Sequence, residues 1–209
     1  MPDPSPPATF LIIRHAATHW NAHRRIQGHQ DTPLTPEGIG QALSWGKRLK
    51  ACAVDRILAS DLGRAVETAR LINQSLGVPV ETDPRLREQD WGEWSGLTMN
   101  RIREQHPEKL AVETTAPWFF QPPAGEDRLS VLARAHRCLE EAASRWPASR
   151  ILVVSHEGVI KALLYFLASR CSSRRKLSRI RPDHLHVLTG TAETLRIKAL
   201  NRMALEVAG

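Results

Sequence analysis

Three short runs of large apolar residues, each ended abruptly by polar side chains, constrain the fold of this 209-residue chain more than any other feature. Residues 10–13, 56–59 and 151–154 have the length and the β-branched, apolar composition of buried strands. Segments of helical periodicity separate them. Because strands alternate with helices, the sequence predicts an α/β fold, a three-layer α/β/α sandwich around a largely parallel sheet.

Local start and stop signals delimit the predicted helices. Thr35 is a suitable N-cap, and Pro36 suits the first position of a helix that runs to about Leu49. Gly77 ends the helix that follows Asp61. The spacing of apolar residues predicts further helices over residues 97–106, 128–146 and 158–168.

The remaining strands are expected at the edges of the sheet. Residues 78–80 contain a proline, which an edge strand tolerates. Residues 184–189 and 193–198 are predicted to form a hairpin that adds an antiparallel edge strand. His184 and His186 would then point to one face of a half-exposed strand.

The chain is expected to form a single domain over residues 9–209. Residues 1–8 are rich in proline and predict a disordered leader. A lid segment is expected over about residues 97–127. Its part from 107 to 127 is interrupted by prolines and is interpreted as a cover rather than core, with the apolar triplet Trp118-Phe119-Phe120.

Composition narrows the setting and the partners. The net charge of +7 favours anionic partners. Three cysteines without paired spacing argue against a disulfide framework and favour a reducing cytoplasm. No signal peptide and no apolar run of roughly 20 residues are visible, so we expect a cytoplasmic protein with no membrane partner. The basic residues 170–181 are interpreted as solvated surface, with an acidic substrate tail or nucleic acid as the alternative ligand.

Polar groups follow each of the three central strands. Arg14 and His15 end the first strand, Ser60-Asp61 with Arg64 follow the second, and Ser155-His156 follow the third. The carboxyl ends of parallel strands meet at one edge of a sheet, where ligands bind. Two guanidinium groups beside an imidazole suit a phosphoryl group, which needs charged donors and an in-line nucleophile.

Six blocks of sequence carry these residues and follow one another across residues 9–165. They are Arg14-His15 with Thr18, Trp20 and Asn21; Gln27-Gly28; Asp31 to Thr35; Ser60-Asp61 with Arg64, Glu67 and Thr68; Glu88 with Gly92, Trp94 and Gly96; and Ser155-His156-Glu157-Gly158. Together they resemble the histidine phosphatase superfamily, the family of the cofactor-dependent phosphoglycerate mutases. The resemblance implies a phosphoglycerate mutase-like fold for residues 9–209.

The resemblance also implies roles for the site residues. His15 is expected to be the nucleophile that becomes a phosphohistidine, with its remote ring nitrogen protonated and bonded to a carbonyl. Arg14 and Arg64 are expected to clamp phosphoryl oxygens. Asn21 should supply an amide donor, and His156, as an imidazolium beside a helix N-terminus, a fourth phosphate ligand.

Glu88 is the expected general acid, which protonates the leaving oxygen and then activates water. Glu93 and Glu126 are its rivals in the sequence. Gln27, Gly28 and Glu157 complete the expected phosphate- and substrate-binding set. Four residues depart from the family pattern. Ala16 stands where glycine usually follows Arg-His, Ala17 replaces a common glutamate, Glu157 stands where glycine usually follows the second histidine, and Asp127 stands where the phosphatases often have serine after Gly-Glu.

The sequence favours a phosphomonoester hydrolase, of histidine acid type, that acts on a small phosphorylated metabolite. The resemblance offers α-ribazole phosphate and sugar phosphates as candidate substrates. The alternative within the family is a phosphoglycerate mutase-type phosphotransferase, disfavoured because residues 100–127 lack paired arginines. A non-catalytic binder of phospho-ligands or nucleic acid is a third reading. No metal and no cofactor are expected, because no histidine spacing suggests a set of metal ligands. The sequence leaves open whether the protein forms a homodimer.

Overall fold

A six-stranded sheet forms the centre of the computed structural model, which describes residues 6–169 and 180–204. In spatial order the strands are β3 (Val80–Thr82), β2 (Arg56–Ala59), β4 (Arg150–Ser155), β1 (Ala8–Arg14), β5 (His184–Gly190) and β6 (Leu195–Ala204). The first four are mutually parallel, whereas β5 is antiparallel to both β1 and β6. The predicted mixed sheet is thereby confirmed: the C-terminal hairpin of β5 and β6 extends one edge, and it joins the parallel strands through the antiparallel pairing of β5 with β1.

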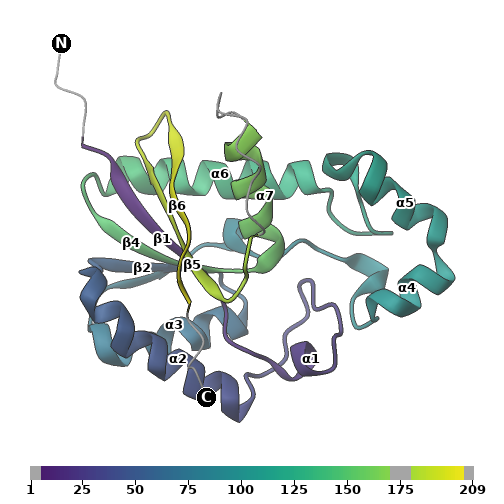
Figure 1. Ribbon diagram of the computed structural model, residues 1–209, viewed down its shortest axis with the longest axis horizontal. Coiled ribbons are helices and arrows are strands. Elements are labelled where there is room, and N and C mark those ends of the chain that lie inside the picture. The colour runs from purple at the N-terminus through teal and green to yellow at the C-terminus, as the bar shows by residue number, and fades with distance from the viewer. Residues whose placement is uncertain (1–5, 170–179, 205–209) are drawn as a thin grey trace.

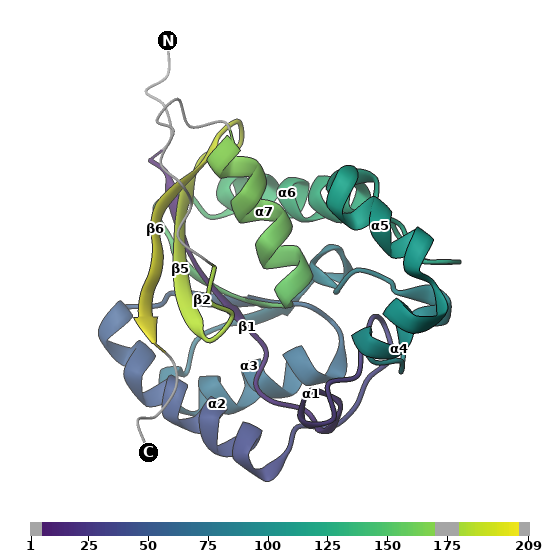
Figure 2. The same ribbon diagram turned by 45° about the vertical axis from the view of Figure 1, so that its right-hand side comes forward.

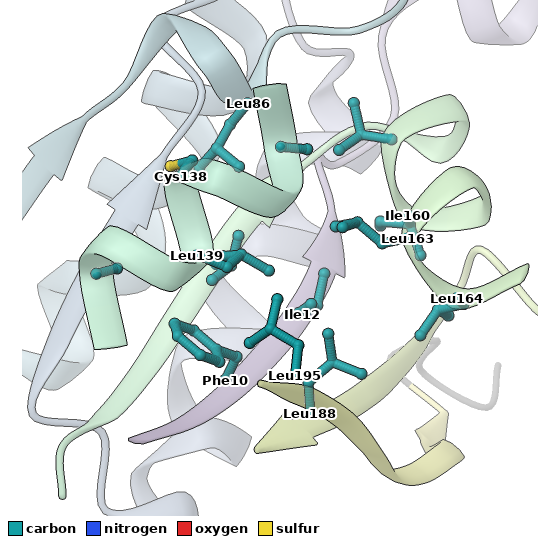
Figure 3. Packing of buried hydrophobic residues seen from close by; sticks show 14 of the residues in the cluster. Phe10, Ile12, Leu86, Cys138, Leu139, Ile160, Leu163, Leu164, Leu188 and Leu195 are labelled. Atoms are coloured by element: carbon teal, nitrogen blue, oxygen red, sulfur yellow. The ribbon is translucent and has the colours of Figure 1, made fainter. Parts of the chain in front are cut away.

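Helices cover both faces of the sheet, as Figure 1 shows. The first layer holds α2 (Pro36–Leu49) and α3 (Gly63–Leu76), and the second holds α6 (Arg128–Arg145) and α7 (Glu157–Ser169). In β1, Leu11 and Ile13 join the core under α2 and α3, while Phe10 and Ile12 join the core under α6 and α7. Figure 3 shows the second of these cores. The alternation follows from the two-residue period of a strand, so the central strands must be apolar throughout.

Local signals in the sequence account for the ends of these helices. The Thr35 side chain accepts a hydrogen bond from the amide of Gly38, and Pro36 occupies the first position of α2. Gly77 caps α3 in the left-handed conformation. A short α1 (His19–Ala22) lies in the loop after β1 and is capped by Thr18.

The lid segment is more helical than its prolines suggested. It contains α4 (Met99–Gln105), α5 (Pro107–Thr115) and the single 3-10 turn η4 (Pro117–Phe119). The prediction that prolines break residues 107–127 was wrong at Pro107, because proline at the first helical position begins α5. Figure 2 shows α4 beside the loop that carries α1. In the backbone, the Ile26 amide donates to the Leu97 carbonyl and the Gly96 amide donates to the Ile26 carbonyl.

The apolar triplet of the lid is divided by the structure. Phe120 is fully buried with Trp94 and Ile102 in a small core of its own, whereas Phe119 is 71% exposed. Trp118 packs partly against the main core and also lines the cavity described below. Only one of the three rings therefore reaches the site.

Several sequence expectations need correction. Ala8, assigned to the leader, begins β1 and is fully buried. The edge strand β3 lies two residues later than predicted. His184 and His186 are buried rather than half exposed, because β6 covers the sheet edge beyond β5. Residues 1–5 of the expected leader, and residues 170–179 of the basic segment, lie outside the described residues.

No helix in the part of the chain that the structure describes is long and apolar enough to cross a membrane.

Candidate active site

The site lies where β1, β2 and β4 end. β1 and β4 are adjacent with Arg14 opposite Ser155, and β2 flanks β4. A cavity of about 750 Å³ opens at this edge, and Arg14, His15, Arg64 and Glu88 all line it. Of the polar residues that follow β2, Arg64 lines the cavity. Asp61 does not line it and is paired with the Arg87 guanidinium.

His15 is held in one tautomer. Its Nδ1 lies 2.8 Å from the Ala16 carbonyl, which can only accept, so Nδ1 carries the proton and Nε2 keeps a free lone pair. Burial, followed by the charges of Arg14 and Arg64, lowers the pKa of His15 well below its usual value. The ring is therefore neutral at neutral pH, the form in which an imidazole can attack phosphorus.

Arg64 is the most rigidly held cation of the site. Its side chain is almost completely buried, and its guanidinium donates to the Gly28 carbonyl, the Gln30 carbonyl and the Asp31 carboxylate at 2.8–2.9 Å. Asp31 also accepts from the amides of Gly63 and Arg64 at the start of α3. Asp31 therefore holds Arg64 in place, whereas the sequence analysis included Asp31 only in the block from Asp31 to Thr35 and gave it no role.

His156 is fully buried beside His15, with ring centroids 5.1 Å apart. Neither of its ring nitrogens has a hydrogen-bond partner within the described residues, and His156 is not among the residues that line the cavity. The expected imidazolium concerns the phosphate-bound protein and stays a prediction. Burial, then the charges of His15, Arg64 and Arg14, lowers the pKa of His156 well below its usual value, so the ring is neutral.

Glu88 is the only one of the three candidate acids that lines the cavity. Its Oε2 accepts from the Gly158 amide at 3.2 Å and its Oε1 from the Gln89 amide at 2.9 Å. Glu126 is instead paired with Arg134, and Glu93 is exposed away from the cavity. Geometry therefore places Glu88 in the position that a general acid needs.

The residues after β1 form a second wall of the cavity, which Asn21, Gln27 and Gly28 all line. The Asn21 Oδ1 accepts from the Thr18 amide and hydroxyl, so its NH₂ group is the part that can donate to a ligand. Gly28 has φ +53, and a Cβ there would lie 2.8 Å from the Ser95 hydroxyl. The backbone at this turn thus requires glycine.

Glu157 forms an ion pair with Arg14 at the wall of the cavity. Its Oε2 accepts from the Arg14 NH1 at 2.8 Å, and its Oε1 accepts from the Lys161 ammonium one helical turn further along α7. The sequence analysis named Glu157 but missed Arg25, Arg128 and Lys161, which also line the cavity. Only the spacing of four between Glu157 and Lys161 could have indicated one of them.

The described residues contain no cluster of three or more histidine, cysteine or carboxylate side chains that could hold a metal ion. Arginine side chains are therefore the groups at hand to balance the charge of a phosphoryl ligand.

The fold and the site together define an α/β protein with a buried, neutral histidine between two arginines at the carboxyl edge of its sheet. The family model of the histidine phosphatase superfamily (branch 1) matches residues 10–203, and the chain belongs to that superfamily.

Relatives and solved structures carry both phosphatase and mutase names. A curated protein of Cronobacter sakazakii, "Probable phosphoglycerate mutase GpmB", is 40% identical over 145 residues, which are 69% of this chain and 67% of that protein. The structure of YhfR from Bacillus stearothermophilus is 30% identical with a TM-score of 0.83, covering 95% of this chain and 100% of the other. The alpha-ribazole phosphatase of Shigella flexneri is 26% identical with a TM-score of 0.78, covering 96% and 100%.

Proposed function

We propose that this protein is a phosphomonoester hydrolase that acts through a phosphohistidine on a small phosphorylated metabolite. The observation that carries the proposal is the state of His15: neutral, fixed by the Ala16 carbonyl and flanked by Arg14 and Arg64, with Nε2 free. A phosphatase is among the similar structures, the alpha-ribazole phosphatase, and supports the reaction class without naming this protein's substrate.

The reaction proceeds in two displacements. In the first, Nε2 of His15 forms a bond to phosphorus while the bond to the leaving oxygen breaks, and Glu88 in its acid form donates a proton to that oxygen. In the second, the Glu88 carboxylate takes a proton from water, which attacks phosphorus and releases His15 and inorganic phosphate. Arg14, Arg64, Asn21 and His156 bind the phosphoryl oxygens throughout.

A phosphoglycerate mutase-type phosphotransferase is the second candidate, supported by the name of the Cronobacter relative. A mutase must retain its phosphohistidine while the bound intermediate reorients, so it needs a closed lid and a carboxylate clamp. Here Arg128, the first residue of α6, lines the cavity beside the lid and is already paired with Glu113 of α5. This pairing favours the hydrolase.

The test combines turnover with chemical trapping. The native chain, in excess chelator, should hydrolyse an aryl phosphate, and brief mixing should give an acid-labile, base-stable phosphoryl adduct on His15. The variant His15→Ala should remain folded but lose turnover by at least about 10³-fold, as expected for a lost nucleophile. Adduct on a serine or aspartate, or dependence on added metal, would refute the mechanism.

Phosphoglycerate isomerisation, measured beside phosphate release with and without bisphosphoglycerate, separates the two candidates. A hydrolase should release phosphate faster than it isomerises and should need no primer. Isomerisation that outruns release and requires the primer would establish the mutase instead.

A further inference from the structure

A carboxylate lies at the wall of the phosphate cavity, where it can act on the charge of whatever enters. Glu157 and Arg14 both line the cavity beside His15, and their side chains are 30% and 26% exposed. Lys161 holds the second oxygen of Glu157 from the next turn of α7. The carboxylate is thus fixed between two cations instead of turning away to solvent.

Glu157 keeps its negative charge at neutral pH. Burial by itself would raise the pKa of Glu157, but the charge of Arg14 and the hydrogen bond from Lys161 outweigh it and leave the pKa lowered. A ligand that approaches Arg14 therefore meets a full negative charge next to the guanidinium.

The described residues that line the cavity carry a small excess of positive charge. With the histidines neutral, they comprise five cationic and three anionic side chains, an excess of two positive charges, or of three when Glu88 is in the acid form that the first displacement needs. These side chains are Arg14, Arg25, Arg64, Arg128 and Lys161, against Glu88, Glu113 and Glu157.

The cations in the outer part of the cavity are already engaged. Lys161 is paired with Glu157, and Arg128 with Glu113. Arg25 is exposed and donates to the Gly96 carbonyl at 3.3 Å. The wall between them is apolar or aromatic, formed by Ile26, Trp91, Met99 and Trp118. Among the described residues that line the cavity, a second anionic group on the substrate would find no unpaired buried cation, and it would face the Glu157 carboxylate.

We propose that Glu157 is a specificity-determining residue that excludes phosphomonoesters carrying a second anionic group near the phosphate, so that the substrates have leaving groups without negative charge. This inference rests on the proposed hydrolase function and adds to it the class of leaving group. It also assigns a role to a side chain that stands where the family pattern has glycine.

The experiment compares two substrates that differ mainly in one charge. Glycerol 3-phosphate and 3-phosphoglycerate have the same carbon chain, but only the second carries a carboxylate. The ratio of their kcat/KM values should favour glycerol 3-phosphate in the native protein. Glu157→Gln should shift this ratio toward 3-phosphoglycerate by about tenfold, the scale of one partly screened charge pair at close range. Lys161→Met, which removes the neighbouring cation, should shift it in the opposite direction.

Glu193→Gln is the matched control. It makes the same change of charge in the turn after β5, where Gly190 pairs with Ala8 at the opposite end of β1 from Arg14. Its ratio should equal that of the native protein. A native ratio near one, or a ratio that Glu157→Gln leaves unchanged, would overturn the proposal.

Binding separates this inference from the function on which it rests. Dissociation constants of the two compounds, measured by calorimetry, should show the same shift in ratio. Binding with the expected ratio but no hydrolysis would refute the hydrolase and keep the charge selection. Hydrolysis of an aryl phosphate without charge selection would keep the hydrolase and refute the role of Glu157. Failure to bind either glycerol 3-phosphate or 3-phosphoglycerate would refute both the hydrolase and the charge selection.

Discussion

At the scale of single residues, Glu88 and Gly158 form one unit. The Gly158 amide donates to the Glu88 carboxylate, and a Cβ on Gly158 would lie only 2.3 Å from Glu88 Oε1. A methyl group would fit there only if the Glu88 carboxylate moved, so the absence of a side chain on Gly158 lets Glu88 keep its position. The conformation of Gly158 in α7 would otherwise favour alanine.

Glu88→Gln should lower turnover of alkyl phosphates by about 10²-fold or more, since their poor leaving groups need a proton. Aryl phosphates, whose leaving groups need less help, should lose less activity. Gly158→Ala should reproduce this selective loss by displacing the Glu88 carboxylate. Steady-state kinetics on the two substrate types measures both variants.

Gly40→Ala in α2 is the control for the glycine change, because nothing lies within 4 Å of its Cβ position. It should leave kinetics unchanged and raise the free energy of unfolding by up to about 1 kcal/mol. If Glu88→Gln reduced both substrate types equally, Glu88 would not be the acid and the rivals Glu93 and Glu126 would have to be tested.

At the scale of elements, α6 fixes the segment that carries Glu88. Arg134 donates from α6 to the carbonyls of Arg85, Arg87 and Glu88 at 2.6–3.0 Å, and its guanidinium is paired with Glu126. The side chain is 19% exposed, so these bonds are shielded from water. A helix that belongs to the core thereby sets the position of a catalytic loop.

Arg134→Leu should therefore affect both stability and catalysis. Loss of these charged hydrogen bonds should lower the free energy of unfolding by about 1–3 kcal/mol and reduce kcat for alkyl phosphates. Arg137→Leu, one turn along the same helix, is the control: its side chain is 76% exposed and paired with Glu141, so it should change stability by less than about 1 kcal/mol. Urea unfolding and steady-state kinetics measure both variants. Equal effects of Arg134→Leu and Arg137→Leu would contradict the role of Arg134 in holding the Glu88 segment.

Elements governed by local signals were predictable from sequence, whereas those governed by packing were not. The apolar runs, the Thr35 cap and Gly77 act within a few residues, and they gave the central strands, α2 and α3. Pro107 was misinterpreted because proline either breaks a helix or begins one, and the local sequence does not distinguish the two.

The same division applies to the site. Strand ends carrying Arg14, His15 and His156 could be found from sequence, because a strand and its terminal polar residues are contiguous. The neutral state of His156 could not, since it depends on burial and on arginines distant in the chain. Arg25, in the loop after β1, and Arg128, at the start of α6, likewise line the cavity although they are distant from the strand ends in the sequence.

At the scale of the whole molecule, burial of histidines makes stability depend on pH. The pKa values of His15, His156 and His186 are all lowered, in each case mainly by burial. Below the usual histidine pKa of about 6.5 the unfolded chain binds protons that the folded chain refuses, so stability rises with pH in this range. Carboxylates with lowered pKa values, such as Asp61 and Glu157, lose their contribution only at more acidic pH, as their own folded-state pKa values are approached.

The free energy of unfolding should accordingly be nearly constant above about pH 7.5 and should fall as the pH drops through about 6.5 toward 5, by up to about 1.4 kcal/mol per pH unit for each buried histidine that stays neutral. His156→Gln removes one such group and should reduce the slope by up to that amount. His23→Gln, which changes an exposed ring, should leave the slope as it is. Urea unfolding followed by tryptophan fluorescence across this pH range measures all three chains, and a native curve that stays flat from about pH 7.5 to 5.5 would show that these histidines are not held neutral by the fold.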